Sequence, residues 1–429
     1  MIRARRLRAS TAELAGGAAW VLGAYVAAIG LRAILQLALA HWLGAEALGA
    51  YVSAVTLGGL LGIAATGGIG AAALRFVPLY QGAEDARLLA SFQAFAARWP
   101  LLLGVPIGLA GGLGAWWAAP RLLPGSAPLL VAVVPLVALL TVQSEVARAF
   151  GRMALAYVPQ QALPAAGTLL ACLALQATGR LSASTAFAAY AAALLASVVV
   201  QRRRLHAPRD AEAPLDRHAA PRRQWLRVSM PLLAASVLAM ALAQGDVLLV
   251  GATLGGGSTG VYAAAVRIAY LAGLPLLAVS AVAVPALSRD VARGDLPSME
   301  ARFRRAARLA AALTFAAAAG CWLAGPWLLG VLGAEFEAGA STLRVVLLGQ
   351  LAQSALGPVE QLLGATGHQD AALAVAAAST AALVAMTVAF ALAWGLVGAA
   401  AGATLGQLLW RGALAALMAK RLGVRAGAW

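Results

Sequence analysis

Twelve long apolar runs, separated by short turns that contain charges, Gly or Pro, dominate this chain of 429 residues. A helix needs roughly 20 apolar residues to cross a bilayer, so each run is long enough to span one. Hydrophobic residues make up 62% of the chain and charged residues 11%, whereas soluble domains average about 45–50% and about 25%. We therefore predict an all-α polytopic membrane protein. The twelve predicted spans are residues 16–43, 48–73, 88–118, 127–149, 155–178, 182–201, 226–252, 259–287, 308–333, 341–364, 371–393 and 396–418.

The spans divide into two halves of six, on either side of the one long polar stretch. This stretch, residues 202–225, is basic and contains Pro, which predicts a flexible cytoplasmic linker between lobes 1–201 and 226–429. The halves share a motif at an offset of 211 residues, because LGAEALGAYVSAV begins at residue 43 and LGGGSTGVYAAAV at residue 254. Two like-oriented six-helix halves related by pseudo-two-fold symmetry are typical of transporters that bind substrate between the halves.

The charge distribution predicts the orientation in the membrane. The 32 Lys and Arg residues outnumber the 16 Asp and Glu residues. In a soluble protein this excess would suggest nucleic acid, but cytoplasmic loops of membrane proteins carry the cations. With both termini in the cytoplasm, 26 of the 32 cations lie in segments on the cytoplasmic side. We therefore predict cytoplasmic termini and no nucleic-acid partner.

Several kinds of chemistry are excluded by residues that the chain lacks. Lys420 is the only lysine, so there is no P-loop lysine and no P-loop ATPase. Cys172 and Cys321 lie within apolar runs, and no CxxC or HExxH motif occurs, so no metal or other cofactor is predicted. A glycosyltransferase or polymerase would need carboxylate motifs such as DxD or a large external loop. Neither is present, so the chain is predicted not to be an enzyme.

Five of the charged residues inside the predicted spans are candidate site residues. A charge at the bilayer centre costs about 2.5–3.5 kcal/mol on insertion scales, so such residues usually face a partner or a wet cavity. We predict that Arg32, Arg267 and Arg98 are cations of a substrate cavity, although Arg98 could instead reach the membrane surface. Asp246 and Glu360 are predicted to couple an ion or to gate the cavity. For Asp246 an ion pair with Arg267, on the next helix and at a similar depth, is the structural alternative.

An excess of arginine in the cavity suggests the chemistry of the substrate. The guanidinium group stays charged and binds phosphate in a bidentate manner. A site with Arg32 and Arg267 facing each other therefore favours a diphosphate or an acidic sugar over a cationic drug.

Several segments of the chain resemble one family. They are QGDVLLVG at 244–251, GVYAAAVRI at 260–268, PALS at 285–288, and residues 328–370 with Gly333, Glu335, Phe336, Gly357 and Pro358. In the first half, Gly44, Gly49, Tyr51 and the run Gly68-Ile69-Gly70 fit the same pattern. Together they resemble the polysaccharide transporter family of the MATE-like flippase superfamily.

The resemblance implies a flippase of the O-antigen or exopolysaccharide (Wzx) type in the bacterial cytoplasmic (inner) membrane. Such proteins move undecaprenyl-diphosphate-linked oligosaccharide outward by alternating access, for lipopolysaccharide or other surface polysaccharide biosynthesis. Without a nucleotide motif, an ion gradient or the membrane potential would drive the cycle. The implied partners are the lipid-linked oligosaccharide, membrane lipids, a polysaccharide polymerase and a chain-length regulator. The alternative is a cation-coupled drug or metabolite antiporter of the same fold, which would favour an acidic cavity.

Overall fold

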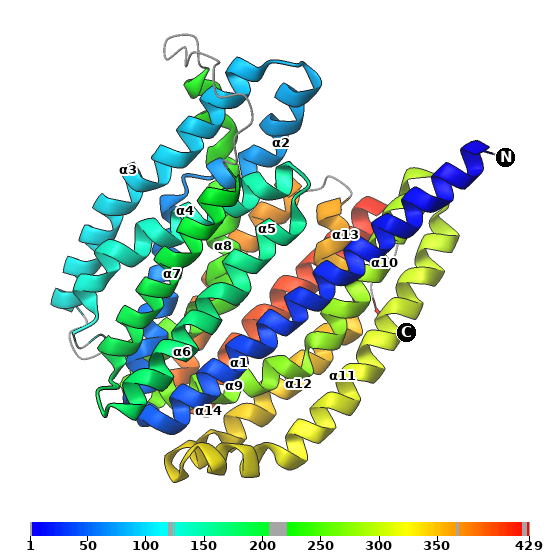
Figure 1. Cartoon of the computed structure of the whole chain (residues 1–429). Coiled ribbons are helices and arrows are strands. Elements are labelled where there is room, and N and C mark those ends of the chain that lie inside the picture. Colours follow the sequence, from blue (N-terminus) through cyan, green and yellow to red (C-terminus); the bar gives the residue numbers. More distant parts are fainter. Residues whose placement is uncertain are drawn as a thin grey trace.

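The protein, described from a computed structural model, is a bundle of long helices arranged as two lobes (Figure 1). The structure describes the backbone of residues 2–118, 123, 125–205, 221–365, 369–422 and 427–428, and these residues contain no strand. The N-terminal lobe contains α1 (Ile2–Ala65), α2 (Ile69–Gly82), α3 (Ala86–Ala118), α4 (Leu130–Ala149), α5 (Met153–Tyr157), α6 (Leu163–Ala177) and α7 (Ala183–Leu205). The C-terminal lobe contains α8 (Arg222–Leu254), α9 (Gly256–Ala272), α10 (Leu274–Ala292), α11 (Leu296–Leu332), α12 (Ala340–Leu356), α13 (Val359–Ala365) and α14 (Gln369–Leu422).

The prediction of twelve spans in two six-helix lobes is confirmed. Nine helical segments of the described chain are long and apolar enough to cross a membrane. Of these, α1 and α14 each contain two predicted spans that meet at a kink. A further predicted span, residues 341–364, corresponds to α12 and α13. The predicted span 259–287 is longer in the structure, where it consists of α9 and α10 with a break at Gly273.

The internal repeat is visible in the backbone at equivalent glycines. Gly44 has φ 76° and ψ 176° at the kink of α1. Gly255, which lies 211 residues later, has φ 88° and ψ 176° between α8 and α9. A positive φ is unfavourable for residues with a side chain, so glycine allows the chain to reverse direction at both places. The pseudo-two-fold relation predicted from the motif therefore holds in the structure.

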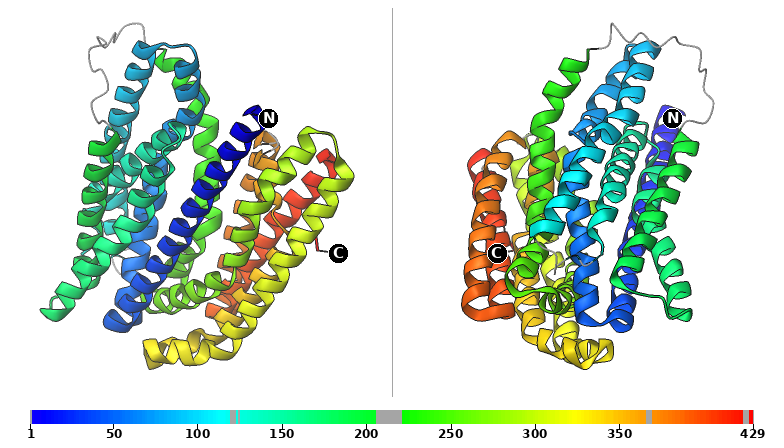
Figure 2. Two further views of the ribbon diagram at one scale, coloured as in Figure 1. Left: turned by 45° about the vertical axis from the view of Figure 1, so that its right-hand side comes forward. Right: turned by 90° about the vertical axis from the view of Figure 1, so that its left-hand side faces the viewer.

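The two lobes touch where these reversals occur and, apart from α8, diverge toward the end at which α1 begins (Figure 2). We call these the closed end and the open end. At the closed end α1 packs on α9 through two glycines that are also 211 residues apart. A Cβ added to Gly49 would lie 2.0 Å from the Gly256 carbonyl oxygen, and one added to Gly260 would lie 1.8 Å from that of Ala45. The backbones of the two lobes are therefore in direct contact, as small residues permit between membrane helices.

Exposed tryptophans mark the closed-end level of both lobes. Trp116 lies near the end of α3 and Trp327 near the end of α11, and each has 68% of its surface exposed. These two residues are again 211 positions apart. Tryptophan is enriched where membrane helices meet the headgroup region. The pair therefore indicates one membrane–water interface.

The predicted linker 202–225 is shorter in the structure. Helix α7 extends to Leu205 and α8 starts at Arg222, while residues 206–220 lie outside the described residues. Trp225 is fully buried, and its indole N–H donates to the Tyr80 hydroxyl at 2.7 Å. Its ring also packs against Phe92 at 5.2 Å. The first turns of α8 are thus anchored in the N-terminal lobe, because burying the large indole ring stabilises this contact and its N–H has a hydrogen-bond partner.

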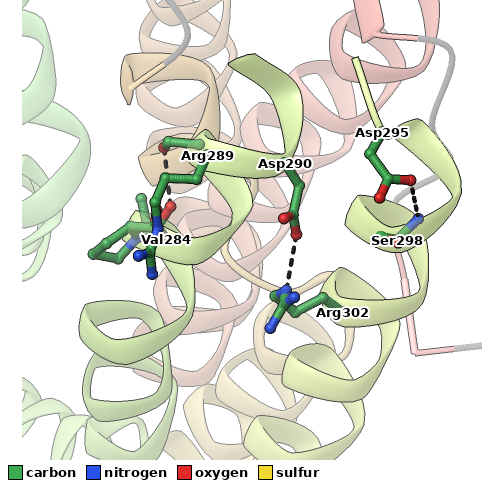
Figure 3. Close-up of polar contacts among 8 residues, drawn as sticks. Val284, Arg289, Asp290, Asp295, Ser298 and Arg302 are labelled. Carbon is green, nitrogen blue, oxygen red and sulfur yellow. Dashed lines mark hydrogen bonds and ion pairs between the residues drawn. The ribbon is translucent and has the colours of Figure 1, made fainter. Parts of the chain in front are cut away.

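The turn between α10 and α11 belongs to the arginine-rich stretch predicted as cytoplasmic. Arg302 donates to the Asp290 carboxylate at 2.8 Å across this turn (Figure 3). Asp295 caps α11 by accepting from the Ser298 N–H at 3.1 Å, and this bonding lowers the pKa of the Asp295 carboxyl. The turn lies at the open end (Figure 1).

Candidate functional site

A cavity of about 510 Å³ lies between the two lobes. Ligand sites of this kind typically measure about 300–1,000 Å³. The N-terminal lobe contributes residues of α1, α4, α6, α7 and the turn before α6, and the C-terminal lobe contributes α8 and α9. The polar and charged lining residues are Arg32, Gln36, Tyr51, Thr56, Thr141, Gln160, Gln161, Tyr190, Gln244, Asp246, Arg267 and Tyr270.

Arg32 and Arg267 both line this cavity, one from each lobe. They are close enough for the charge of Arg32 to act on that of Arg267. Within the described residues neither arginine has a carboxylate within ion-pair distance. Among the described lining residues Asp246 is the one acid. The cavity therefore presents two unpaired cations in a partly buried setting, which an anion would stabilise.

Gln36 holds the side chain of Arg267 in place. Its amide oxygen accepts from the Arg267 Nε–H at 2.5 Å, and its amide nitrogen donates to the Ala263 carbonyl at 3.1 Å. The Gln36 residue itself is only 7% exposed. Because Gln36 occupies Nε alone, the two Nη groups of Arg267 keep their donors for a ligand. Gln36 lies on α1 and Arg267 on α9, so the contact also joins the lobes.

The alternative of an Asp246–Arg267 ion pair is wrong. The buried Asp246 carboxylate accepts from the Tyr262 hydroxyl at 2.7 Å and from the Val247 N–H at 3.0 Å. Arg267 is directed instead to Gln36. Tyr262 precedes Arg267 by more than one turn of α9, so Asp246 meets α9 at a different level from Arg267.

Arg98 and Glu360 lie outside the cavity. Arg98 is exposed on α3, which agrees with the alternative that its side chain reaches the surface. Glu360 is partly buried in the first turn of α13, where its charge interacts with that of Arg411 on α14. Of the five predicted site residues, the cavity thus brings together Arg32, Arg267 and Asp246.

An irregular helical turn of the N-terminal lobe lines the cavity beside Arg32. Residues Val158–Ala162 form a π-helical turn between α5 and α6. Pro159 has no N–H for the carbonyl of Leu155, four residues earlier, and this oxygen instead accepts from the Gln201 amide of α7 at 2.9 Å. Pro164 likewise has no N–H for the carbonyl of Gln160. A nitrogen of Arg32 lies 3.5 Å from that oxygen. The two prolines therefore explain both the irregular turn and the carbonyl that faces Arg32.

The neutral polar residues of the cavity were not predicted from the sequence. Gln160 and Gln161 are adjacent in the segment PQQALP, within a span that is mostly apolar. Two prolines five residues apart around a glutamine pair are the signal that could have located this wall. Tyr51 and Tyr190 carry no such signal, because an aromatic residue in a membrane helix is usually a packing residue.

At the closed end, contacts between α1 and the C-terminal lobe lie between the cavity and the membrane–water interface at that end. The Glu335 carboxylate accepts from the Ala45 N–H at 2.6 Å, just after the kink of α1. His41 contacts the Val331 carbonyl at 3.2 Å. Ala45 begins a helical segment, so its N–H has no partner within the helix. A carboxylate placed there also interacts favourably with the helix dipole.

Replacing Glu335 by alanine is expected to destabilise the closed end by about 1 kcal/mol, because the Ala45 N–H loses its acceptor. The glutamine variant should recover part of this loss, since its amide oxygen still accepts. The matched control is Glu337→Ala, because Glu337 is exposed in the same turn. Thermal unfolding of the purified protein measures the difference, and equal effects at 335 and 337 would refute the role of Glu335.

A family model described as "Polysaccharide biosynthesis protein" matches residues 14–290, which is more than half of the chain. No curated protein sequence matches significantly.

Three similar solved structures are 14–16% identical to the chain, so they support the fold alone. An inward-facing multidrug resistance MATE family transporter of the MOP superfamily has a TM-score of 0.73 and covers 91% of this chain and 94% of its own. The lipid II flippase MurJ in an inward closed conformation scores 0.71, with 93% and 87% covered. A MOP superfamily transporter from Pyrococcus furiosus Vc1 (DSM3638) scores 0.63, with 94% and 95% covered. That structure is described as having a binding pocket of reverse polarity.

Proposed function

The chain belongs to the polysaccharide biosynthesis protein family, and on this premise we propose that it flips undecaprenyl-diphosphate-linked oligosaccharide across the bacterial inner membrane. The family and the fold support a multi-pass membrane transporter of the flippase type. The lipid-linked substrate, its direction of movement and a role in O-antigen or exopolysaccharide synthesis are the proposal. A polysaccharide polymerase and a chain-length regulator are its proposed partners.

The observation that carries this proposal is the pair of unpaired arginines in the cavity between the lobes. Arg32 and Arg267 approach the cavity from different lobes and have no carboxylate partner among the described residues. A diphosphate offers oxygens to both guanidinium groups at once, whereas a cationic drug would be repelled. The lining also includes uncharged polar side chains, among them Gln160, Gln161 and Gln244, which can bond the hydroxyl groups of a sugar. The cavity is therefore suited to an anionic headgroup that carries a glycan.

The described conformation is proposed to open toward the cytoplasm. Arginines gather at the open end, on the last turn of α7, the first turn of α8 and the α10–α11 turn. The closed end has few cations, with Arg180 before α7 and Arg344 at the start of α12. Cytoplasmic segments of membrane proteins carry the cations, so the open end and both termini are assigned to the cytoplasm. The higher TM-score with an inward-facing transporter, 0.73, than with an outward-facing one, 0.60, supports this assignment.

The proposed function is tested by deleting the gene and extracting the undecaprenyl-linked lipids. We expect a complete repeat unit to accumulate on its diphosphate carrier while surface polysaccharide is lost, because the donor lipid would stay in the cytoplasmic leaflet. Normal lipid intermediates and intact surface polysaccharide, together with changed drug tolerance, would instead support the antiporter alternative.

Asp246 is proposed to couple an ion to the movement of the lobes. It is 3% exposed, and its hydrogen bond to Tyr262 joins α8 to α9 beside the arginines. Asp246→Asn is expected to keep the protein folded and to make flipping insensitive to an imposed ion gradient, since the amide can still accept from Tyr262. Reconstituted vesicles with and without a proton or sodium gradient measure this effect. The same gradient response in the variant and the parent would contradict the role of Asp246. Glu360→Gln tests the second predicted coupling site in the same assay.

A further inference from the structure

The cavity carries a second set of polar groups, which have no hydrogen-bond partner among the residues that the structure describes. The side-chain amides of Gln160 and Gln161 line the cavity, as does that of Gln244 on α8. Within the described chain none of these three amides makes a hydrogen bond. The Tyr190 hydroxyl of α7 also lines the cavity and makes no hydrogen bond with the described residues. Polar groups within a membrane protein usually have a partner, so an unpartnered set indicates a ligand or water.

The π-helical turn is what presents two consecutive glutamines to one cavity. In a regular α-helix neighbouring residues point about 100° apart, so both seldom face the same space. The wider turn at Val158–Ala162, caused by Pro159 and Pro164, allows Gln160 and Gln161 to line the cavity together. Such turns cost regular hydrogen bonds and occur often at functional sites. The chain restores one of those bonds with the buried Gln201 side chain.

The position of the turn relative to Arg32 suggests what it binds. The carbonyl oxygen of Gln160 lies 3.5 Å from an Arg32 nitrogen, so the glutamine pair is directly beside one of the two cations. A group bound by the glutamines would therefore be attached close to the anionic group bound by the arginines. Amides donate and accept at once, which matches the hydroxyl groups of a sugar ring, whereas an ionised phosphate only accepts and would use only the NH2 group of each amide.

We propose that Gln160 and Gln161, with Tyr190 and Gln244, form a subsite for the sugar that is linked directly to the diphosphate. This proposal rests on the proposed function. The arginines then hold the diphosphate, which is common to all such lipids, and the amides contact the first sugar. Discrimination between glycosylated and bare carrier lipid would arise at the π-helical turn.

The test measures binding of two soluble probes to the purified protein by calorimetry. One probe is a short prenyl diphosphate such as citronellyl diphosphate, and the other is the same molecule carrying one hexose or N-acetylhexosamine. We expect the parent to bind the glycosylated probe about tenfold more tightly, because the sugar adds hydrogen bonds to the amides. The variant Gln160→Leu/Gln161→Leu is expected to lose this gain and to bind the bare diphosphate within about twofold of the parent.

The controls separate the subsite from folding and from the proposed function. Gln176→Leu is the matched control, because Gln176 is exposed on α6 and outside the cavity. Gln161→Asn, which shortens the side chain and keeps its amide, should give an intermediate loss. An unchanged preference in the double variant, an equal loss for both probes, or no preference in the parent would overturn the subsite and leave the flippase proposal standing. A parent that binds neither probe would overturn both.

Discussion

Replacing Arg267 by alanine is expected to lower the affinity for a diphosphate-linked lipid about 10- to 100-fold and to stop flipping. Hydrogen bonds to a charged group contribute roughly 1.5–3 kcal/mol, and a bidentate contact lies in the upper part of that range. The variant also leaves the buried Gln36 amide oxygen without its donor. Calorimetry with citronellyl diphosphate measures the affinity, and reconstituted vesicles measure the flipping.

The matched control is Arg98→Ala, because Arg98 is exposed on α3 and does not line the cavity. Arg267→Lys keeps a charge but loses the planar group that bonds Gln36 and phosphate together, so it should recover only part of the affinity. Arg32→Ala should resemble Arg267→Ala, since both cations face the same cavity. If Arg267→Ala inserts normally and flips substrate as the parent does, the cavity does not bind a diphosphate.

Replacing Gly260 by alanine is expected to force the lobes apart at the closed end. The new Cβ would lie 1.8 Å from the Ala45 carbonyl oxygen, which is backbone and cannot rotate away. Overpacking of this kind typically costs about 1–3 kcal/mol, enough to shift a conformational equilibrium by roughly 10- to 100-fold. Gly49→Ala meets the Gly256 oxygen at 2.0 Å and should act in the same direction.

Spin labels can measure this separation. Trp116→Cys and Trp327→Cys place one label on each lobe at exposed positions, after Cys172 and Cys321 have been replaced by alanine. In the parent the distance should be narrowly distributed, and in Gly260→Ala it should lengthen. Gly257→Ala is the control, because a Cβ there has no atom within 4 Å. The same distances in all three proteins would mean that the glycine contact does not hold the closed end together.

Much of the fold could be predicted because membrane insertion imposes strong local rules. Each span needs a long apolar run, and cations stay on one side, so the number of helices and the expected orientation follow from the order of residues. The repeat was visible as well, since a backbone reversal needs glycine at Gly44 and again at Gly255. Breaks within spans, such as that between α9 and α10 at Gly273, were not predicted, because the hydropathy of the run does not change there.

The site was predicted only where charge made a residue conspicuous. Arg32, Arg267 and Asp246 stand out because each is costly in an apolar span. Their partners do not stand out, since Gln36 and Tyr262 are neutral and are chosen by the rotation and depth of facing helices. The same reason accounts for the wrong pairing of Asp246 with Arg267.

The sequence by itself determined the class of protein, the twelve spans, the repeat and the presence of buried cations, because these depend on hydropathy, charge and local backbone freedom. Only the tertiary structure decided which charges share the cavity, and it excluded Arg98 and Glu360 from it. It also brought Gly49 against α9 and the glutamine pair beside Arg32. These relations join residues far apart in the chain, and their cause is the packing angle between helices, which no local pattern of residues encodes.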